Sequence, residues 1–382
     1  MRFLHTSDWH LGKTLKGRSR SDEHEAALSE ILDLVRREQV DCVLITGDLF
    51  DSQAPPPESE RLAFNFFSEL RGLNVSAVII GGNHDHPRRL LAIRDVFRLI
   101  DIHVRPEPVR PVDGGVIQLQ KNGERAEIAV LPFVTAGRIE DAAKLMGPEI
   151  ERFQGYAERI AAMSDTLTKS FSAKTINLLM AHLYVDGAQT SLSEREIHVA
   201  KPYAVSPQTF PSTAHYIALG HLHRPQEVAA PSRAMYAGSI LQLDFGERDQ
   251  QKRVVVIDAK PGRPAAVESY PLASGRQLRD VSGTLDELKA ASESFGNDLL
   301  RVTIKVDKPT SGTADTVRDI LPNALEIRLD YPRQEAEPMQ IAGADPHDLF
   351  TRFYMHQRAS SPSDEMSALF RKLYEEALDA SV

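Results

Sequence analysis

Five runs of apolar residues each end in a short polar loop, and three stretches near them have helical spacing. The runs are short and aliphatic, as in Val78-Ile79-Ile80, which predicts buried strands. The helical stretches cover residues 22–37, 59–70 and 89–99. Because strands that alternate with helices pair in parallel through right-handed crossovers, the first part of the chain predicts an α/β core.

Shorter strands take over near residue 116. The predicted elements are strands at 116–119 and 128–132, a helix at 149–170, and strands at 234–237 and 253–258. We therefore expect residues 1–270 to form two mixed β-sheets sandwiched between helices. The polar loops should lie together at one edge of this sandwich, because parallel strands end on the same side.

A smaller unit is predicted after residue 270. It has a helix, a strand, a helix and a strand in turn, at 285–292, 299–306, 315–320 and 325–329. We interpret it as a small α/β accessory domain at 275–335. A segment with proline and glycine at 336–344 predicts a linker behind it.

Residues 345–382 predict a helical hairpin. Its first helix begins at Asp345-Pro346 and its second at Ser361-Pro362, where each pair provides a capping side chain and a first-turn proline. Leu369 and Leu373 belong to an apolar stripe along the second helix. The stripe either packs on the core of the chain or docks on a partner helix, and the sequence leaves both open.

Composition and charge narrow the class of protein. Of 382 residues, 42% are hydrophobic and 26% are charged, as is typical of globular domains. No apolar stretch reaches the roughly 18 residues of a membrane helix, so no membrane association is expected. The single cysteine, Cys42, excludes an internal disulfide and favours the reducing cytoplasm.

The distribution of charge adds a hint about the substrate. The net charge of −9 argues against a surface coated all over with nucleic acid. A cluster of cations nevertheless follows the first polar loop, at Lys13, Lys16, Arg18 and Arg20. Such a cluster would steer a polyanionic substrate toward the loops at the strand ends.

The polar loops carry only carboxylate, amide and imidazole side chains as candidate ligands. They are Asp8, His10, Asp48, Asn83, His182, His221 and His223. Oxygen and imidazole donors without thiolate suit Mn²⁺, Fe²⁺ or Zn²⁺ better than a closed structural zinc site. Ligands from five strand ends, with Asp48 as a bridging carboxylate, predict a two-metal hydrolase.

The loop at residues 81–86 also contains candidates for proton transfer. His84 stands next to a ligand and is the candidate general acid, and Asp85 is expected to orient it. His86 either assists His84 or is an ordinary loop histidine. Gly12-Lys13-Thr14 resembles the end of a phosphate-binding P-loop, but Ser7 occupies the position of its first glycine, which excludes an ATP site here.

These motifs resemble the calcineurin-like metallophosphoesterase superfamily. The matching residues are Asp8-x-His10, Gly47-Asp48-x-x-Asp51, Gly82-Asn83-His84-Asp85, His182 and Gly220-His221-x-His223. The resemblance covers residues 1–260. The longer stretches 6–12, 218–226 and 236–247 are similar to one branch, bacterial nuclease subunits that act with an SMC-like ATPase.

The resemblance implies a ligand assignment and an activity. It assigns one metal to Asp8, His10, Asp48 and His223, the other to Asp48, Asn83, His182 and His221, and the role of general acid to His84. The implied enzyme is an Mn²⁺-dependent DNA nuclease, regulated by the ATPase. It acts as a 3′→5′ exonuclease on duplex ends and as an endonuclease on single strands and hairpins.

The resemblance also implies partners. Residues 275–335 would cap the active site and guide DNA, and the hairpin at 345–382 would clasp the coiled coil of the ATPase. Residues 59–70 and 89–100 are apolar over more than one helical stripe, which predicts a homodimer interface. Two alternatives remain: a phosphatase or cyclic-nucleotide phosphodiesterase with the same metal core, and an inactive DNA-end scaffold, against which the complete ligand set argues.

Overall fold

The structure, a computed structural model, describes residues 1–191, 193–310, 312–332, 345–358 and 360–379. Contacts divide the chain into two compact units, Met1–Asp330 and Tyr331–Val382. The predicted linker at 336–344 lies outside the described residues. None of the helices in the described ranges combines the length and the hydropathy that a membrane span requires.

The first unit contains two six-stranded sheets. The strands of the first sheet are, in spatial order, β14 (Arg263–Pro271), β13 (Arg253–Lys260), β1 (Arg2–Thr6), β4 (Cys42–Ile45), β5 (Ser76–Ile80) and β6 (Ile102–Arg105). β1, β4, β5 and β6 are parallel, whereas β13 runs antiparallel to β1 and to β14. The parallel strands therefore end at one edge, as expected from the intervening helices.

The second sheet repeats this arrangement. Its strands are, in spatial order, β11 (Gln226–Val228), β12 (Ala234–Tyr236), β10 (Tyr216–Gly220), β9 (Ile176–His182), β8 (Glu124–Leu131) and β7 (Val116–Lys121). The four central strands are parallel, and β11 and β7 are antiparallel strands at the two sides.

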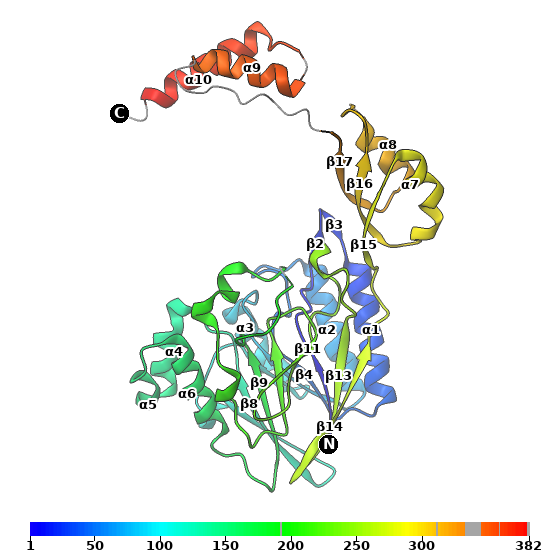
Figure 1. The fold of residues 1–382 in the computed structure, drawn as a ribbon. Helices are drawn as coiled ribbons and strands as arrows, with labels where there is room; N and C mark the ends of the chain where they lie inside the picture. The colour runs from blue at the N-terminus through cyan, green and yellow to red at the C-terminus, as the bar shows by residue number, and fades with distance from the viewer. Residues whose placement is uncertain (192, 311, 333–344, 359, 380–382) are drawn as a thin grey trace. The chain divides into compact units, whose positions relative to one another are not determined.

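Helices cover the outer faces of the two sheets (Figure 1). They are α1 (Ser21–Arg37), α2 (Pro57–Gly72) and α3 (Pro87–Arg98) on the first sheet, and α4 (Ile139–Met146), α5 (Pro148–Glu151) and α6 (Tyr156–Thr168) on the second. Between the sheets, Phe3 and Leu44 from one pack with Leu178 and Met180 from the other. This arrangement confirms the predicted sandwich of two mixed sheets between helices.

The region predicted as one helix at 149–170 is divided in two. α5 ends at Glu151, and α6 begins after Gly155, whose backbone N–H donates to the carboxylate of Glu158 at 3.2 Å. The prediction of a continuous helix was therefore wrong, because a glycine begins a new helix inside the apolar periodicity. The separate helix α4 was not predicted.

A small parallel sheet follows the sandwich within the first unit. Its elements are β15 (Leu278–Gly283), α7 (Leu285–Ala291), β16 (Leu299–Lys305), α8 (Thr313–Ile320) and β17 (Ala324–Asp330). The predicted order of helix, strand, helix and strand is confirmed, with β15 as an additional first strand.

The small sheet is joined to the sandwich by an apolar cluster of four buried residues. Leu15 and Phe245 from the sandwich pack with Leu278 and Leu299 from the small sheet. Leu15 belongs to a short hairpin, β2 (Thr14–Leu15) and β3 (Arg18–Ser19), that follows the first polar loop. The cluster therefore connects loops next to the strand ends with the small sheet.

The second unit contains the predicted pair of helices, α9 (Pro346–Arg358) and α10 (Asp364–Asp379). The ring of Phe350 stacks on that of Phe370, with centroids 4.2 Å apart. Leu369 and Leu373 are 52% and 54% exposed. The helical hairpin is thus confirmed as an element, and the hairpin itself leaves Leu369 and Leu373 of its apolar stripe uncovered.

Candidate metal centre

The candidate ligands lie together at one edge of the sandwich. They come from the end of β9 and from the loops that follow β1, β4, β5 and β10. One group consists of Asp8, His10 and His223, whose ligand atoms lie within 4.8 Å of one another. The Nε2 atoms of His10 and His223 are 3.1 Å apart. Two nitrogens that bind one ion at about 2.1 Å and at a right angle lie about 3 Å apart, so this spacing fits a shared cation.

A second group consists of Asn83, His182 and His221. The Oδ1 atom of Asn83 lies 3.0 Å from Nε2 of His182 and 2.8 Å from Nδ1 of His221. Three donors again converge on one point, this time with a neutral amide oxygen in place of a carboxylate.

Asp48 stands between the two groups. Its Oδ2 atom lies 3.7 Å from Nε2 of His10 and 3.5 Å from Nε2 of His182. Its Oδ1 atom accepts a hydrogen bond from the backbone N–H of His84 at 2.8 Å. One carboxylate therefore faces both groups, as a ligand shared by two ions requires.

Several of these residues have a strained backbone. The φ angles are 49° for Asp8, 48° for His10, 50° for Asp48 and 102° for His221, all in the region that side chains with a Cβ avoid. Hydrogen bonds between neighbouring loops hold them there, including Asp8 N–H to the carbonyl of Gly47 at 3.1 Å. Such a backbone conformation persists where the surroundings over-determine it.

Two glycines permit the close approach of these loops. A Cβ at Gly82 would lie 2.2 Å from Oδ1 of Asp48, and a Cβ at Gly220 would lie 1.9 Å from the carbonyl oxygen of Thr46. Both distances are far below van der Waals contact. The strand-end glycines are therefore a steric requirement of the ligand cluster.

Burial shifts the protonation of most of the cluster. It lowers the pKa of His10 to about 4 and also lowers the pKa of His182 and of His221. Burial raises the pKa of Asp8 well above its usual value. The pKa of His223 is instead raised, because its hydrogen bond to Glu247 and the charge of that carboxylate outweigh burial. Neutral imidazoles at the other three positions, beside buried carboxylates, are the chemical setting that a divalent cation stabilises.

The second nitrogen of each imidazole contacts an oxygen. The pairs are His10 Nδ1 with Asp51 Oδ1 (3.2 Å), His182 Nδ1 with the carbonyl of Thr46 (2.7 Å), His221 Nε2 with the carbonyl of His198 (3.3 Å), and His223 Nδ1 with Glu247 Oε1 (3.1 Å). Each pair fixes the ring proton on the nitrogen that faces away from the cluster. The facing nitrogen is left free to bind a metal, so the residues present fit two divalent ions.

His84 lies beside this cluster. Its ring is 4.6 Å from that of His10, and its Nδ1 donates to the backbone carbonyl of Asp51 at 2.7 Å. The ring is therefore oriented by Asp51 from one side and faces the ligands from the other. His86 lies at the N-terminus of α3 and takes part in neither contact.

The expectation that Asp85 orients His84 does not match its contacts. Its carboxylate accepts hydrogen bonds from the backbone N–H groups of Leu49, Phe50 and Gly82 at 3.0–3.3 Å. Burial, together with the charge of Asp48, raises the pKa of Asp85 to about 7. Asp85 thus ties two ligand loops together, because backbone donors rather than an imidazole surround its oxygens.

Each of the four cations after His10 has a partner within the chain: Lys13 with Asp51 (3.2 Å), Lys16 with Glu326 (3.2 Å), Arg18 with Asn323 (3.0 Å) and Arg20 with Glu23 (2.7 Å). Three of these partners are carboxylates, whereas the amide of Asn323 leaves the charge of Arg18 uncompensated. Steering of a polyanion by this cluster stays a prediction.

Sequence reasoning missed several residues around the centre. Glu247 is fully buried behind His223, and Arg195 reaches within 3.5 Å of Nδ1 of His84 from the loop after β9. Asp51 and Glu247 belong to the sequence motifs given above, but those motifs did not predict that they contact the imidazoles of His10 and His223. Arg195 lies in a segment without any motif, and only the folded loop brings it to the site.

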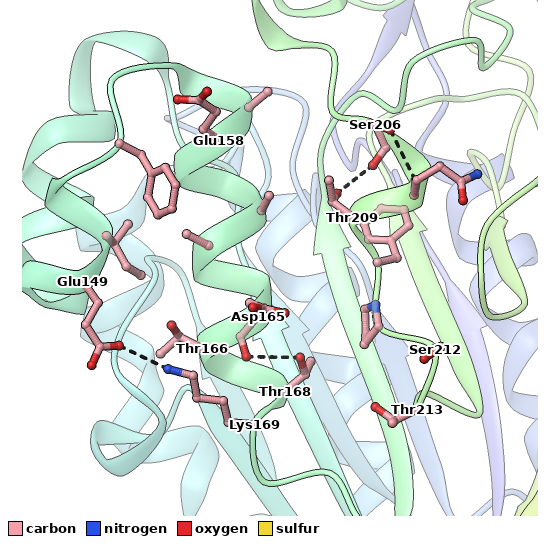
Figure 2. Close-up of a pocket in the computed structure, with 18 of the residues that line it drawn as sticks. Glu149, Glu158, Asp165, Thr166, Thr168, Lys169, Ser206, Thr209, Ser212 and Thr213 are labelled. Carbon is pink, nitrogen blue, oxygen red and sulfur yellow. Dashed lines mark hydrogen bonds and ion pairs between the residues drawn. The ribbon is translucent and has the colours of Figure 1, made fainter.

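A pocket without candidate ligands lies between helices and a loop of the second sheet (Figure 2). It has a volume of about 860 Å³ between α5, α6 and residues 206–213. Glu149, Asp165 and Lys169 line it, with Glu149 and Lys169 paired at 3.1 Å. No candidate metal ligand is among its lining residues. Its size is therefore no guide to the chemistry of this protein.

Comparison with known proteins agrees with the fold. The family model described as calcineurin-like phosphoesterase matches residues 1–225, which defines the class of protein. A second model, described as type 5 capsule protein repressor C-terminal domain, matches residues 274–358.

Two relatives narrow the class. The SbcD component of the nuclease SbcCD from Bacillus subtilis is 33% identical over 98% of this chain and 97% of its own length. The protein of the same name from Rhodobacter capsulatus is 30% identical over 91% of each chain. The chain therefore belongs to the calcineurin-like phosphoesterase family, in its SbcD branch.

Among solved structures, a dimetal phosphatase from Danio rerio aligns over 70% of this chain and 98% of its own. The identity is 11% and the TM-score is 0.40, a likeness too weak to carry an argument.

Proposed function

We propose that this chain is the metal-dependent nuclease component of an SbcCD complex and hydrolyses phosphodiester bonds of DNA at two divalent ions. The observation that carries the proposal is the carboxylate of Asp48, placed between two groups of converging donors. The names of the relatives support DNA cleavage over the hydrolysis of phosphomonoesters or cyclic nucleotides.

Two bound divalent ions would supply Lewis acidity at the phosphoryl oxygens and activate the attacking water. The proposed ligands of one ion are Asp8, His10, Asp48 and His223, and those of the other are Asp48, Asn83, His182 and His221. Buried and fixed in their tautomers, these side chains need no rearrangement to bind. This pre-organisation keeps the reacting phosphate in one geometry.

His84 is the proposed general acid for the leaving oxygen. Because its Nδ1 donates to the carbonyl of Asp51, Nε2 is the atom that would carry the transferred proton. Asp85 acts indirectly, through its bonds to the backbone of Leu49, Phe50 and Gly82. Its role is to hold the loops of Asp48 and His84 together.

Mn²⁺ is the proposed metal. Carboxylate, amide and imidazole donors without thiolate suit a cation of intermediate hardness. The proposed reactions are 3′→5′ exonuclease cleavage of duplex ends and endonuclease cleavage of single strands and hairpins, regulated by ATP bound to the SbcC partner.

The proposed division of the chain follows these roles. Residues 1–270 form the nuclease domain, 275–335 the capping domain, 336–344 the linker, and 345–382 the hairpin that binds the coiled coil of SbcC. The exposed side chains of Leu369 and Leu373 support the last assignment, since an amphipathic helix buries such a stripe against a partner.

A homodimer through α2 and α3 is also proposed, on a smaller surface than the sequence suggested. Most of the apolar residues of these helices, such as Phe66 and Phe67, are buried in the core of the sandwich. Phe64, Val96 and Leu99 remain on the surface, with Val96 and Leu99 63% and 80% exposed. This exposed group is the candidate contact between two copies.

The test is a cleavage assay on end-labelled duplex DNA with Mn²⁺, Mg²⁺ or Zn²⁺, with and without SbcC. The proposal predicts release of nucleotides from duplex ends that is greatest with Mn²⁺. Turnover of a phosphomonoester, measured in parallel, should be slow. Rapid phosphomonoester turnover without DNA cleavage would overturn the nuclease assignment and favour a phosphatase.

A further inference from the structure

The two ligand groups differ in what stands behind their imidazoles. The outer nitrogens of His10 and His223 face the carboxylates of Asp51 and Glu247, at 3.2 and 3.1 Å. That of His223 also lies 2.8 Å from the hydroxyl of Ser193, which donates a hydrogen bond to Glu247. In the other group, His182 and His221 donate to neutral backbone carbonyls, at 2.7 and 3.3 Å. Both imidazoles of the first group thus have a carboxylate behind them, and both imidazoles of the second group have a backbone carbonyl.

The ligands themselves are unequal in the same sense. The first group includes the carboxylate of Asp8, whereas the corresponding oxygen donor of the second group is the neutral amide of Asn83. Asp48 faces both groups and favours neither. A cation in the first position therefore has more negative charge around it than a cation in the second.

Glu247 is held in place by an unusually complete set of contacts. It is 0% exposed, and its Oε2 lies 2.6 Å from Nζ of Lys252 and 3.0 Å from the backbone N–H of Leu243. Lys252 also donates to the carbonyl oxygen of His223 at 2.9 Å. The buried pair thus holds His223 at both its ring and its main chain.

Asp51 is the more accessible of the two carboxylates. Its side chain is 25% exposed and is also paired with Lys13 at 3.2 Å. Both carboxylates have a lysine partner, because Glu247 is paired with Lys252 at 2.6 Å. The difference is exposure: water screens the charge of Asp51 more than that of the fully buried Glu247. Replacing Asp51 should therefore have the smaller effect on the imidazole that it contacts.

A carboxylate partner increases the basicity of a metal-binding imidazole, and removal of such a partner weakens metal binding about 10–100-fold. We propose that Asp51 and Glu247 are positioning residues that make the position of Asp8, His10 and His223 fill first. The position of Asn83, His182 and His221 then takes its ion at higher metal concentration. The inference rests on the proposed two-metal function and adds the order in which the ions bind.

The experiment is a titration of the metal-free, full-length chain with Mn²⁺, followed by calorimetry and by electron paramagnetic resonance. The expected result is a tight step that gives the signal of an isolated Mn²⁺ ion. A weaker step should follow and convert it to the signal of a spin-coupled pair. His182→Ala should remove the weak binding step and leave the tight one. This result would assign the weak step to the position of Asn83, His182 and His221, and the tight step to the position of Asp8, His10 and His223.

The carboxylates are tested by Glu247→Gln and Asp51→Asn, which keep an oxygen acceptor and remove the charge. Glu247→Gln should weaken the tight step about 10–100-fold, with a smaller loss for Asp51→Asn, and the weak step should not change. Because Glu247→Gln leaves Lys252 buried without a counter-charge, the double variant Glu247→Gln/Lys252→Met serves if the single variant does not fold.

Glu23→Gln is the matched control. Glu23 is also buried and paired with a buried cation, Arg20 at 2.7 Å, away from the ligands. The change should lower the melting temperature without moving either Mn²⁺ affinity. Equal affinities at the two positions, or an unchanged tight step in both Glu247→Gln and Asp51→Asn, would overturn the inference. Absence of any Mn²⁺ binding would instead overturn the two-metal site itself.

Discussion

Replacement of Gly82 by alanine should inactivate the enzyme while leaving it folded. A Cβ at this position would lie 2.2 Å from Oδ1 and 2.3 Å from the backbone nitrogen of Asp48. Ordinary contact begins near 3.4 Å, so the carboxylate would have to retreat by about 1.2 Å. Since Asp48 faces both ligand groups, one added methyl group disturbs both ions.

The expected loss is about 100-fold in kcat, because a displacement of about 1 Å in a catalytic group has a cost of that order. Both Mn²⁺-binding steps should be weakened as well, since Asp48 faces both groups. Gly72→Ala is the matched control: a Cβ there would meet nothing within 4 Å. Alanine is the better helix former, so this variant should be as stable as the parent or more stable by up to about 1 kcal/mol.

The assay is single-turnover cleavage of end-labelled duplex DNA at saturating Mn²⁺, with melting temperature as the check on folding. If Gly82→Ala cleaves DNA at the rate of the parent, the loop can move away without cost. The close approach of Gly82 would then not be what positions Asp48. If it fails to fold while Gly72→Ala is normal, the clash with the backbone nitrogen of Asp48 dominates, and the expectation that the variant stays folded is wrong.

Three further outcomes are expected. His84→Ala should bind Mn²⁺ and DNA normally but cleave about 10²–10⁴ times more slowly, measured by single-turnover kinetics; parent-like cleavage would remove His84 from proton transfer. The guanidinium of Arg195 lies near Nδ1 of His84, whose proton is already donated to the carbonyl of Asp51, so the ring cannot accept a hydrogen bond from it and the guanidinium is available to a DNA phosphate. Arg195→Gln should therefore raise the KM for DNA and lower the slope of the salt dependence of binding by about one. Glu in place of both Leu369 and Leu373 should abolish co-purification with SbcC without loss of Mn²⁺-dependent cleavage, and retained association would refute the hairpin assignment.

The convergence of the candidate ligands could be predicted because a simple topological rule governs it. In a parallel sheet every strand delivers its next loop to the same edge, so Asp8, Asp48 and Asn83 had to lie near one another. The same rule applies to His182 and His221 in the second sheet. That the two sheets pack face to face follows from the apolar residues on their inner faces.

Contacts between distant segments could not be predicted in this way. Lys16 looked free in the sequence, but its partner, Glu326, is in the small sheet at the far end of the first unit. Asp85 looked like a partner for His84, but three backbone N–H groups from two loops reach it first. No local pattern encodes such pairs, because they depend on how complete elements pack.

The apolar cluster of Leu15, Phe245, Leu278 and Leu299 has a mechanical consequence. Leu15 follows His10 by a few residues in the chain, and Phe245 stands just before Glu247, behind His223. Residues next to both imidazoles of a single ion position are therefore packed against the small sheet, so a substitution that loosens this joint should also loosen that ion position.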